Sequence, residues 1–138
     1  MTQNKTSLLL KVSLVLFAIV AIGFGLVYLL IPEAYVKSTG GEPIPPSWLR
    51  WIGGIMIPIG IGAIMVLRNP VKQGIFVTMI ALGMLLCGLI LLYSLFFENE
   101  GIGYTIATLA PALVNLTLSA LLWISLNQSK ELLWSEEK

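Results

Sequence analysis

The last apolar segment carries the polar side chains best placed to bind a ligand. One face of the predicted helix carries Thr108, Ala112, Asn115 and Ser119, because these positions recur at helical spacing. A primary amide near the middle of a membrane span is costly against lipid, so Asn115 predicts a partner. That partner is either a ligand, such as a lipid headgroup, or another helix through an interhelical hydrogen bond. The hydrogen bond is the commoner arrangement, and both readings stay open.

Aromatic and charged residues gather at those ends of the apolar segments that are expected at the outer leaflet. Arg50 stands between Trp48 and Trp51, while Tyr28 and Tyr93 lie near the ends of two other segments. Such a group favours a pocket open to the outer leaflet, in which Arg50 holds an anion. An aromatic belt with a snorkelling arginine is the commoner explanation of such a group, and both interpretations stay open. Arg50, Tyr28 and Tyr93 are therefore candidate ligand-binding residues, together with Thr108, Asn115 and Ser119.

Residues that commonly perform catalysis are scarce. The chain has no His and no Asp, which removes the commonest metal ligand and the commonest general base. Cys87 is the single cysteine, and a thiol in apolar surroundings is a poor nucleophile, so we expect it to fill space. No charged residue lies inside an apolar segment, unlike in proton-coupled transporters. We expect a protein that is not an enzyme and that binds neither a metal nor a cofactor.

Composition places these residues in a membrane. Of 138 residues 57% are apolar and 11% are charged, against about 25% charged in soluble domains. A soluble fold of this size could not cover so much apolar surface, whereas a bilayer can. The net charge of +1 gives no reason to expect a nucleic-acid partner.

Charged residues divide the chain into four apolar runs, which predict one all-α membrane domain over residues 1–138. The predicted helices cover residues 12–31, 49–67, 75–97 and 105–126, with an outer loop at 32–47 and a tail at 127–138. A helix of twenty residues spans about 30 Å, the thickness of a hydrocarbon core. The first run is longer than the apolar part of a signal peptide, so we expect it to be an anchoring helix.

Small residues recur every seven positions on three of the predicted helices. The stripes consist of Gly53 and Gly60, of Gly74, Ala81 and Gly88, and of Thr105, Ala112 and Ser119. Helices in lipid associate through close packing of such residues, and a period of seven suits left-handed crossing near about +20°. We expect these stripes to face inward in a four-helix bundle.

Loop lengths and positive charges predict the topology. Short connections at 68–73 and 98–103 predict that the second, third and fourth helices are antiparallel neighbours in sequence order. One side of the membrane would hold six basic residues, which are Lys5, Lys11, Arg68, Lys72, Lys130 and Lys138. The other side would hold two, Lys37 and Arg50. Because positive loops stay inside, both termini are predicted to be cytoplasmic.

A family resemblance covers about a third of the chain. Its motifs are Pro32 after the first helix, Gly40 or Gly41, the run Leu49-Arg50-Trp51-Ile52-Gly53-Gly54, Gly60, and the turn Arg68-Asn69-Pro70. In these the chain resembles small bacterial four-helix membrane proteins of the DoxX-like group and related domains of unknown function. The resemblance implies a four-helix bundle in a bacterial inner membrane. Some DoxX-like proteins are subunits of membrane redox assemblies that use quinone.

Two functional hypotheses follow from different classes of protein. The first is a non-enzymatic structural or accessory subunit of a larger membrane assembly, surrounded by membrane lipids, or a homo-oligomer. The second is binding or transport of a small apolar ligand, such as a lipid or quinone. Pro58 and Pro111 are expected to kink the second and fourth helices, and the ligand would lie between those two helices toward the outer side.

Overall fold

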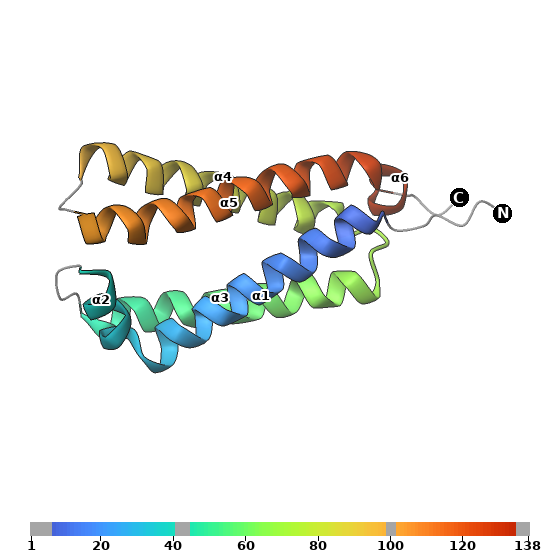
Figure 1. Ribbon diagram of the computed structural model, residues 1–138. Coiled ribbons are helices and arrows are strands. Elements are labelled where there is room, and N and C mark those ends of the chain that lie inside the picture. Colours follow the sequence, from blue (N-terminus) through green and yellow to red (C-terminus); the bar gives the residue numbers. More distant parts are fainter. Residues whose placement is uncertain (1–6, 41–44, 99–101, 135–138) are drawn as a thin grey trace.

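The computed structural model describes residues 7–40, 45–98 and 102–134 (Figure 1). Lys5, Lys138 and Gly41, which the sequence arguments used, lie outside these residues. The elements in the described part are all helices: α1 Leu8–Leu30, α2 Pro32–Thr39, α3 Pro46–Arg68, α4 Gly74–Phe97, α5 Ile102–Gln128 and α6 Lys130–Leu133. The all-helical fold expected from the sequence is confirmed for these residues.

Four of the described helices are long and apolar enough to cross a membrane. They are Leu8–Leu30, Pro46–Arg68, Gly74–Phe97 and, within α5, Ala107–Gln128. Large apolar side chains cover their outer surfaces, as lipid-facing helices require. The chain is therefore a multi-pass membrane protein built as a helical bundle.

The helix ends differ from the sequence expectation for local reasons. Helix α1 begins at Leu8 rather than residue 12, because the Ser7 side chain caps it by accepting a hydrogen bond from the Leu10 amide at 3.2 Å. The segment expected as an outer loop contains α2, which starts with Pro32 at a favourable first position. It ends at Gly40, whose φ of 72° is the left-handed conformation that closes many helices.

Helices α1 and α3 form one closely packed pair. A Cβ built on Gly53 would lie 2.6 Å from the Gly25 carbonyl oxygen, so the two backbones meet directly. Further along, a Cβ on Gly60 would lie 3.3 Å from the Ala21 side chain. Glycine at these positions is what allows the two helices to approach so closely.

Helices α4 and α5 form the second pair. The buried Ser119 hydroxyl donates a hydrogen bond to the Ala81 carbonyl oxygen at 2.8 Å. One turn or so from this bond, Leu116 occupies the space that a Cβ on Gly88 would need. Small residues on α4 thus receive side chains from α5, again without a hydrophobic drive from the solvent.

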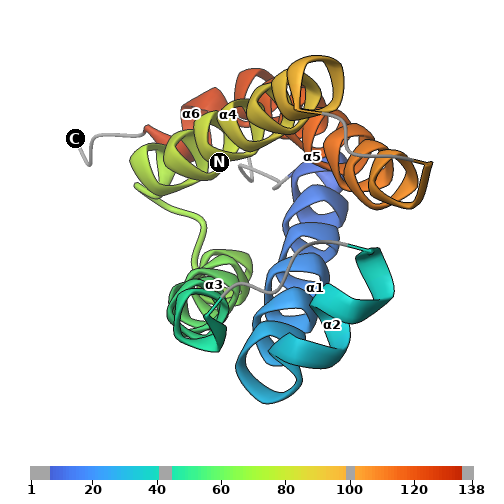
Figure 2. The ribbon, with the colours of Figure 1, turned by 90° about the vertical axis from the view of Figure 1, so that its left-hand side faces the viewer.

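The two pairs meet mainly through α1 and α5, at the end that holds α6 (Figure 1). A short turn joins α3 to α4, but these two helices are not among the closely packed pairs. They do touch close to the turn, where the Phe76 ring of α4 reaches Gly62 of α3. In this respect the structure differs from the expected order of neighbours. The reason is that α3 uses its glycine face for α1, which leaves it beside α4 only near the turn (Figure 2).

The buried apolar core is concentrated in the same half of the molecule. Its members are Leu10, Leu14, Phe17, Ala18 and Ala21 of α1, Ala63 and Val66 of α3, Val77, Ile80, Ala81 and Met84 of α4, Leu118, Leu122 and Leu126 of α5, and Leu133 of α6. Toward the other end the pairs stay packed internally but are not joined by this core. The bundle is consequently tight at the α6 end.

Candidate functional site

The Asn115 side chain satisfies its own helix. Its amide nitrogen donates a hydrogen bond at 2.8 Å to the carbonyl oxygen of Pro111, one turn earlier in α5. The side chain is half-buried. This bond is neither the ligand contact nor the interhelical bond that the sequence favoured. It gives the amide donor a partner that needs no second molecule.

The other polar residues of this face lie inside the bundle. Thr108 and Ser119 are buried, and Ala112 between them has no exposed surface. The Ser119 hydroxyl is used by the bond to Ala81. Helix α5 remains a continuous helix across Pro111, as α3 does across Pro58. Thr108, Asn115 and Ser119 thus share one face, and Ser119 serves there as a contact between helices.

Tyr28 belongs to a cluster of three aromatic rings. Its ring centroid lies 4.9 Å from that of Tyr35 and 5.8 Å from that of Phe24. The Tyr28 hydroxyl also approaches the Tyr35 hydroxyl at 3.5 Å. Tyr35 lies on α2, so the cluster holds this short helix against the end of α1. Edge-to-face contacts of this kind stabilise by about 0.5–1.5 kcal/mol.

Arg50 and Tyr93 lie on different pairs of helices. Arg50, Trp48 and Trp51 are all exposed at the start of α3. Tyr93 is exposed on α4, and its ring stacks against Phe97 with centroids 4.8 Å apart. Each of these residues occupies the surface where the spans end, as an aromatic belt does. No contact in the described part of the chain joins Arg50, Tyr28 and Tyr93 as one site.

All the small residues expected to pack helices lie in the interior except Thr105, which is half-buried. The buried positions are Gly53, Gly60, Gly74, Ala81, Gly88 and Ala112. Cys87, in contrast, is exposed on α4 rather than filling space in the core. Within the described residues, no three His, Cys, Asp or Glu side chains come close enough to hold a metal ion.

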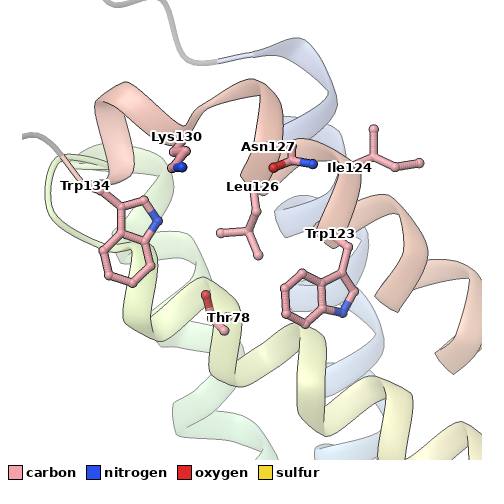
Figure 3. Close-up of a pocket in the computed structure, with 7 residues that line it drawn as sticks. All are labelled: Thr78, Trp123, Ile124, Leu126, Asn127, Lys130 and Trp134. Atoms are coloured by element: carbon pink, nitrogen blue, oxygen red, sulfur yellow. The ribbon is translucent and has the colours of Figure 1, made fainter.

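The structure places a pocket at the end of the bundle where α4, α5 and α6 meet (Figure 3). Its volume is about 470 Å³. The lining residues are Thr78, Trp123, Ile124, Leu126, Asn127, Lys130 and Trp134. None of these residues is among the candidate site residues expected from the sequence. The signal that could have found the pocket is the Leu132-Leu133-Trp134 run inside a polar tail.

Helix α6 is held in place beside this pocket by three contacts. Leu133 has no exposed surface and belongs to the core. The Ser129 hydroxyl donates a hydrogen bond to the Ser7 hydroxyl at 3.0 Å. The Trp134 indole lies over Gly74, where any Cβ would collide with the ring. The pocket wall formed by α6 is therefore part of the fold rather than a loose tail.

Comparisons of this chain with protein-family models, with curated proteins and with solved structures find no match.

Proposed function

We propose that the protein is a non-enzymatic accessory subunit, which binds a transmembrane helix of a larger membrane assembly through the exposed face of α3. The observation that carries the proposal is Gly54. It is exposed, and a Cβ built on it meets nothing within 4 Å. A glycine on the outer surface leaves room for a second backbone to approach closely.

Pro58 adds a polar feature to the same face. It lies one turn after Gly54, is exposed, and has no amide hydrogen to donate to the Gly54 carbonyl. A carbonyl without its helical partner is costly in hydrocarbon, and a donor on another helix would remove that cost. The pairing of α3 with α1 rather than α4 keeps this face available.

The proposal includes a topology and a location. The helices form an antiparallel bundle with both termini in the cytoplasm, in a bacterial inner membrane. Basic residues support this orientation. Figure 1 shows the start of α1, the turn from α3 to α4 and helix α6 at one end, and these segments carry Lys11, Arg68, Lys72 and Lys130. The resemblance to DoxX-like proteins supports the bacterial inner membrane as the location.

The test compares two exposed glycines in cells. A photoreactive residue at Ile61, which is exposed on the face of Gly54, should crosslink the protein to one partner in constant stoichiometry. Gly54→Leu should abolish the crosslink because its side chain fills the space for the partner's backbone. Gly83→Leu is the matched control, since Gly83 is also exposed with nothing within 4 Å of a built Cβ.

Three results would reject the subunit role. They are the absence of a stoichiometric crosslink, equal crosslinking by both variants, and a crosslinked product that contains only copies of this chain. The last result would instead identify a homo-oligomer.

A second candidate function is binding of a small apolar ligand, such as a lipid or quinone, between α3 and α5. The confinement of the core to the α6 half favours it, because Thr108 and Asn115 lie in the half that the core does not join. A short-chain benzoquinone probe should then bind the protein in nanodiscs, and Asn115→Leu should weaken binding at least severalfold. Unchanged binding to Asn115→Leu would exclude this site.

A further inference from the structure

The pocket at α4, α5 and α6 lies at the depth where lipid headgroups begin. The last membrane span ends at Gln128, and the span of α4 begins at Gly74. Thr78 is one turn inside the membrane from Gly74, whereas Lys130 lies just beyond Gln128. The pocket thus extends from the hydrocarbon to the headgroup layer.

The chemistry of the pocket lining changes from the hydrocarbon toward the headgroup layer. The pocket has an apolar wall of Trp123, Ile124 and Leu126. Asn127 and Lys130 supply an amide and an ammonium group at the end nearer the headgroups (Figure 3). Lys130 is exposed, so its charge is available to a ligand. Tryptophan indoles prefer the level of the lipid glycerol and carbonyl groups, where one end is apolar and the other wet.

Basic residues outnumber acidic ones around the pocket. Figure 1 shows the start of α1, the turn from α3 to α4 and helix α6 at this end of the described chain. These segments carry four basic residues, Lys11, Arg68, Lys72 and Lys130, and one acidic residue, Glu131. A basic surface at headgroup depth attracts anionic lipids, by about 1 kcal/mol for each lysine or arginine. The favoured ligand is therefore negatively charged at its polar end and apolar at the other.

The pocket is also formed before any ligand arrives. Leu133 is buried in the core, and Trp134 rests on Gly74, so α6 does not need to be ordered by binding. A preformed site avoids the entropy cost of fixing loops and side chains. Its volume of about 470 Å³ suits a headgroup with its glycerol, while the acyl chains would continue into the bilayer.

We propose that this pocket binds one anionic phospholipid from the leaflet at the α6 end. The phosphate contacts Lys130 and Asn127, and the first part of an acyl chain lies against Trp123 and Ile124. The site is separate from the Gly54 face, so it does not depend on the subunit role.

The experiment uses the two tryptophans of the pocket as reporters. Trp48→Phe and Trp51→Phe remove the other two tryptophans, which are exposed at the opposite end of α3. The protein is placed in vesicles that contain brominated phosphatidylglycerol or brominated phosphatidylcholine, and quenching of indole fluorescence is measured. The anionic lipid should quench with a preference of about fivefold, the effect of one near-surface lysine.

Charge variants separate a site from a general surface effect. Lys130→Gln should lower the preference for the anionic lipid more than Lys11→Gln does, and Lys130→Arg should retain the preference. Lys11→Gln is the matched control, because Lys11 is an exposed cation at the same end but not part of the pocket. Equal quenching by the two lipids in the parent protein would overturn the proposal. Equal losses in Lys130→Gln and Lys11→Gln would also overturn it.

A final arm distinguishes a lipid from a free anion. Inorganic phosphate is added at an ionic strength matched with chloride. If the occupant is a phospholipid, phosphate leaves the quenching by phosphatidylglycerol unchanged. Displacement by phosphate would show a site for the free anion instead.

Discussion

The Ser129 hydroxyl donates a hydrogen bond to the Ser7 hydroxyl at 3.0 Å, although 122 positions separate the two residues. Ser7 caps α1 at the same time, by accepting from the Leu10 amide. The Ser7 hydroxyl therefore both caps the start of α1 and connects the first span to the last. This small contact joins the two helix pairs at the end where their common core lies.

The first prediction concerns this contact. The Ser129 hydroxyl also accepts a hydrogen bond from the Ser7 amide at 3.4 Å, so Ser129→Ala removes two hydrogen bonds. It should lower the free energy of unfolding by about 1–3 kcal/mol, at the usual net value of about 0.5–1.5 kcal/mol for each bond. Unfolding by sodium dodecyl sulfate in mixed micelles measures it. Ser38→Ala is the control, because the Ser38 hydroxyl bonds only the nearby Tyr35 carbonyl on the exposed helix α2.

A double-mutant cycle of Ser7→Ala and Ser129→Ala then isolates the pair from the helix cap. The double variant should lose less stability than the two single variants together. Strict additivity would show that the contact contributes nothing.

The second prediction contrasts two buried serines. The Ser13 hydroxyl is fully buried and has no hydrogen-bond partner within the described residues, whereas Ser119 bonds Ala81. Ser13→Ala should raise the free energy of unfolding by about 1 kcal/mol, because it removes an unsatisfied polar group. Ser119→Ala should lower it by about 0.6 kcal/mol, the average of such bonds between membrane helices. The same assay applies, and effects of equal sign would contradict this account.

The third prediction contrasts two glycines. Gly53→Ala should lower the free energy of unfolding by about 1–3 kcal/mol, since its Cβ would meet backbone atoms of Gly25 and Leu29 that cannot rotate away. Gly83→Ala should raise it by about 0.5–1 kcal/mol, because the new methyl group meets nothing and alanine favours the helix. If Gly53→Ala is as well tolerated as Gly83→Ala, the close contact of α1 with α3 is wrong.

The fourth prediction concerns the midspan amide. Asn115→Leu should change the free energy of unfolding by less than about 0.5 kcal/mol, as is usual for side chains without a partner on another element. The reason is that the amide nitrogen bonds Pro111 of the same helix. A loss well above this value would show that Asn115 also binds another helix.

The sequence was sufficient to predict the membrane-spanning helices, but not which of these helices pack against each other. Apolar runs free of charge predict membrane helices because lipid requires backbone groups to be paired within the segment. The small-residue periodicity also marked Gly53 and Gly60, which the structure buries. The periodicity did not predict that α1 is the helix that packs against these glycines, because any helix with a matching surface can pack against a stripe of glycines.

The pocket escaped sequence reasoning for a different reason. Trp123 and Trp134 are eleven positions apart, and they reach one pocket only because α6 follows α5 and turns toward α4. The bonded pair Asn115 and Pro111 likewise depends on a rotamer that composition does not reveal. Helix formation is a local property, whereas both of these features depend on how the helices and side chains are finally arranged.

The pairing of α1 with α3 and of α4 with α5 has a consequence for biosynthesis. A membrane protein is made from its N-terminus, and each half of this one can assemble as soon as its own second span leaves the ribosome. The halves meet through α1 and α5, whose core residues include Leu14 and Leu122, so they can join only after the fourth span is made. Ser129 and Leu133 follow all four spans, and they complete the contact between the halves last.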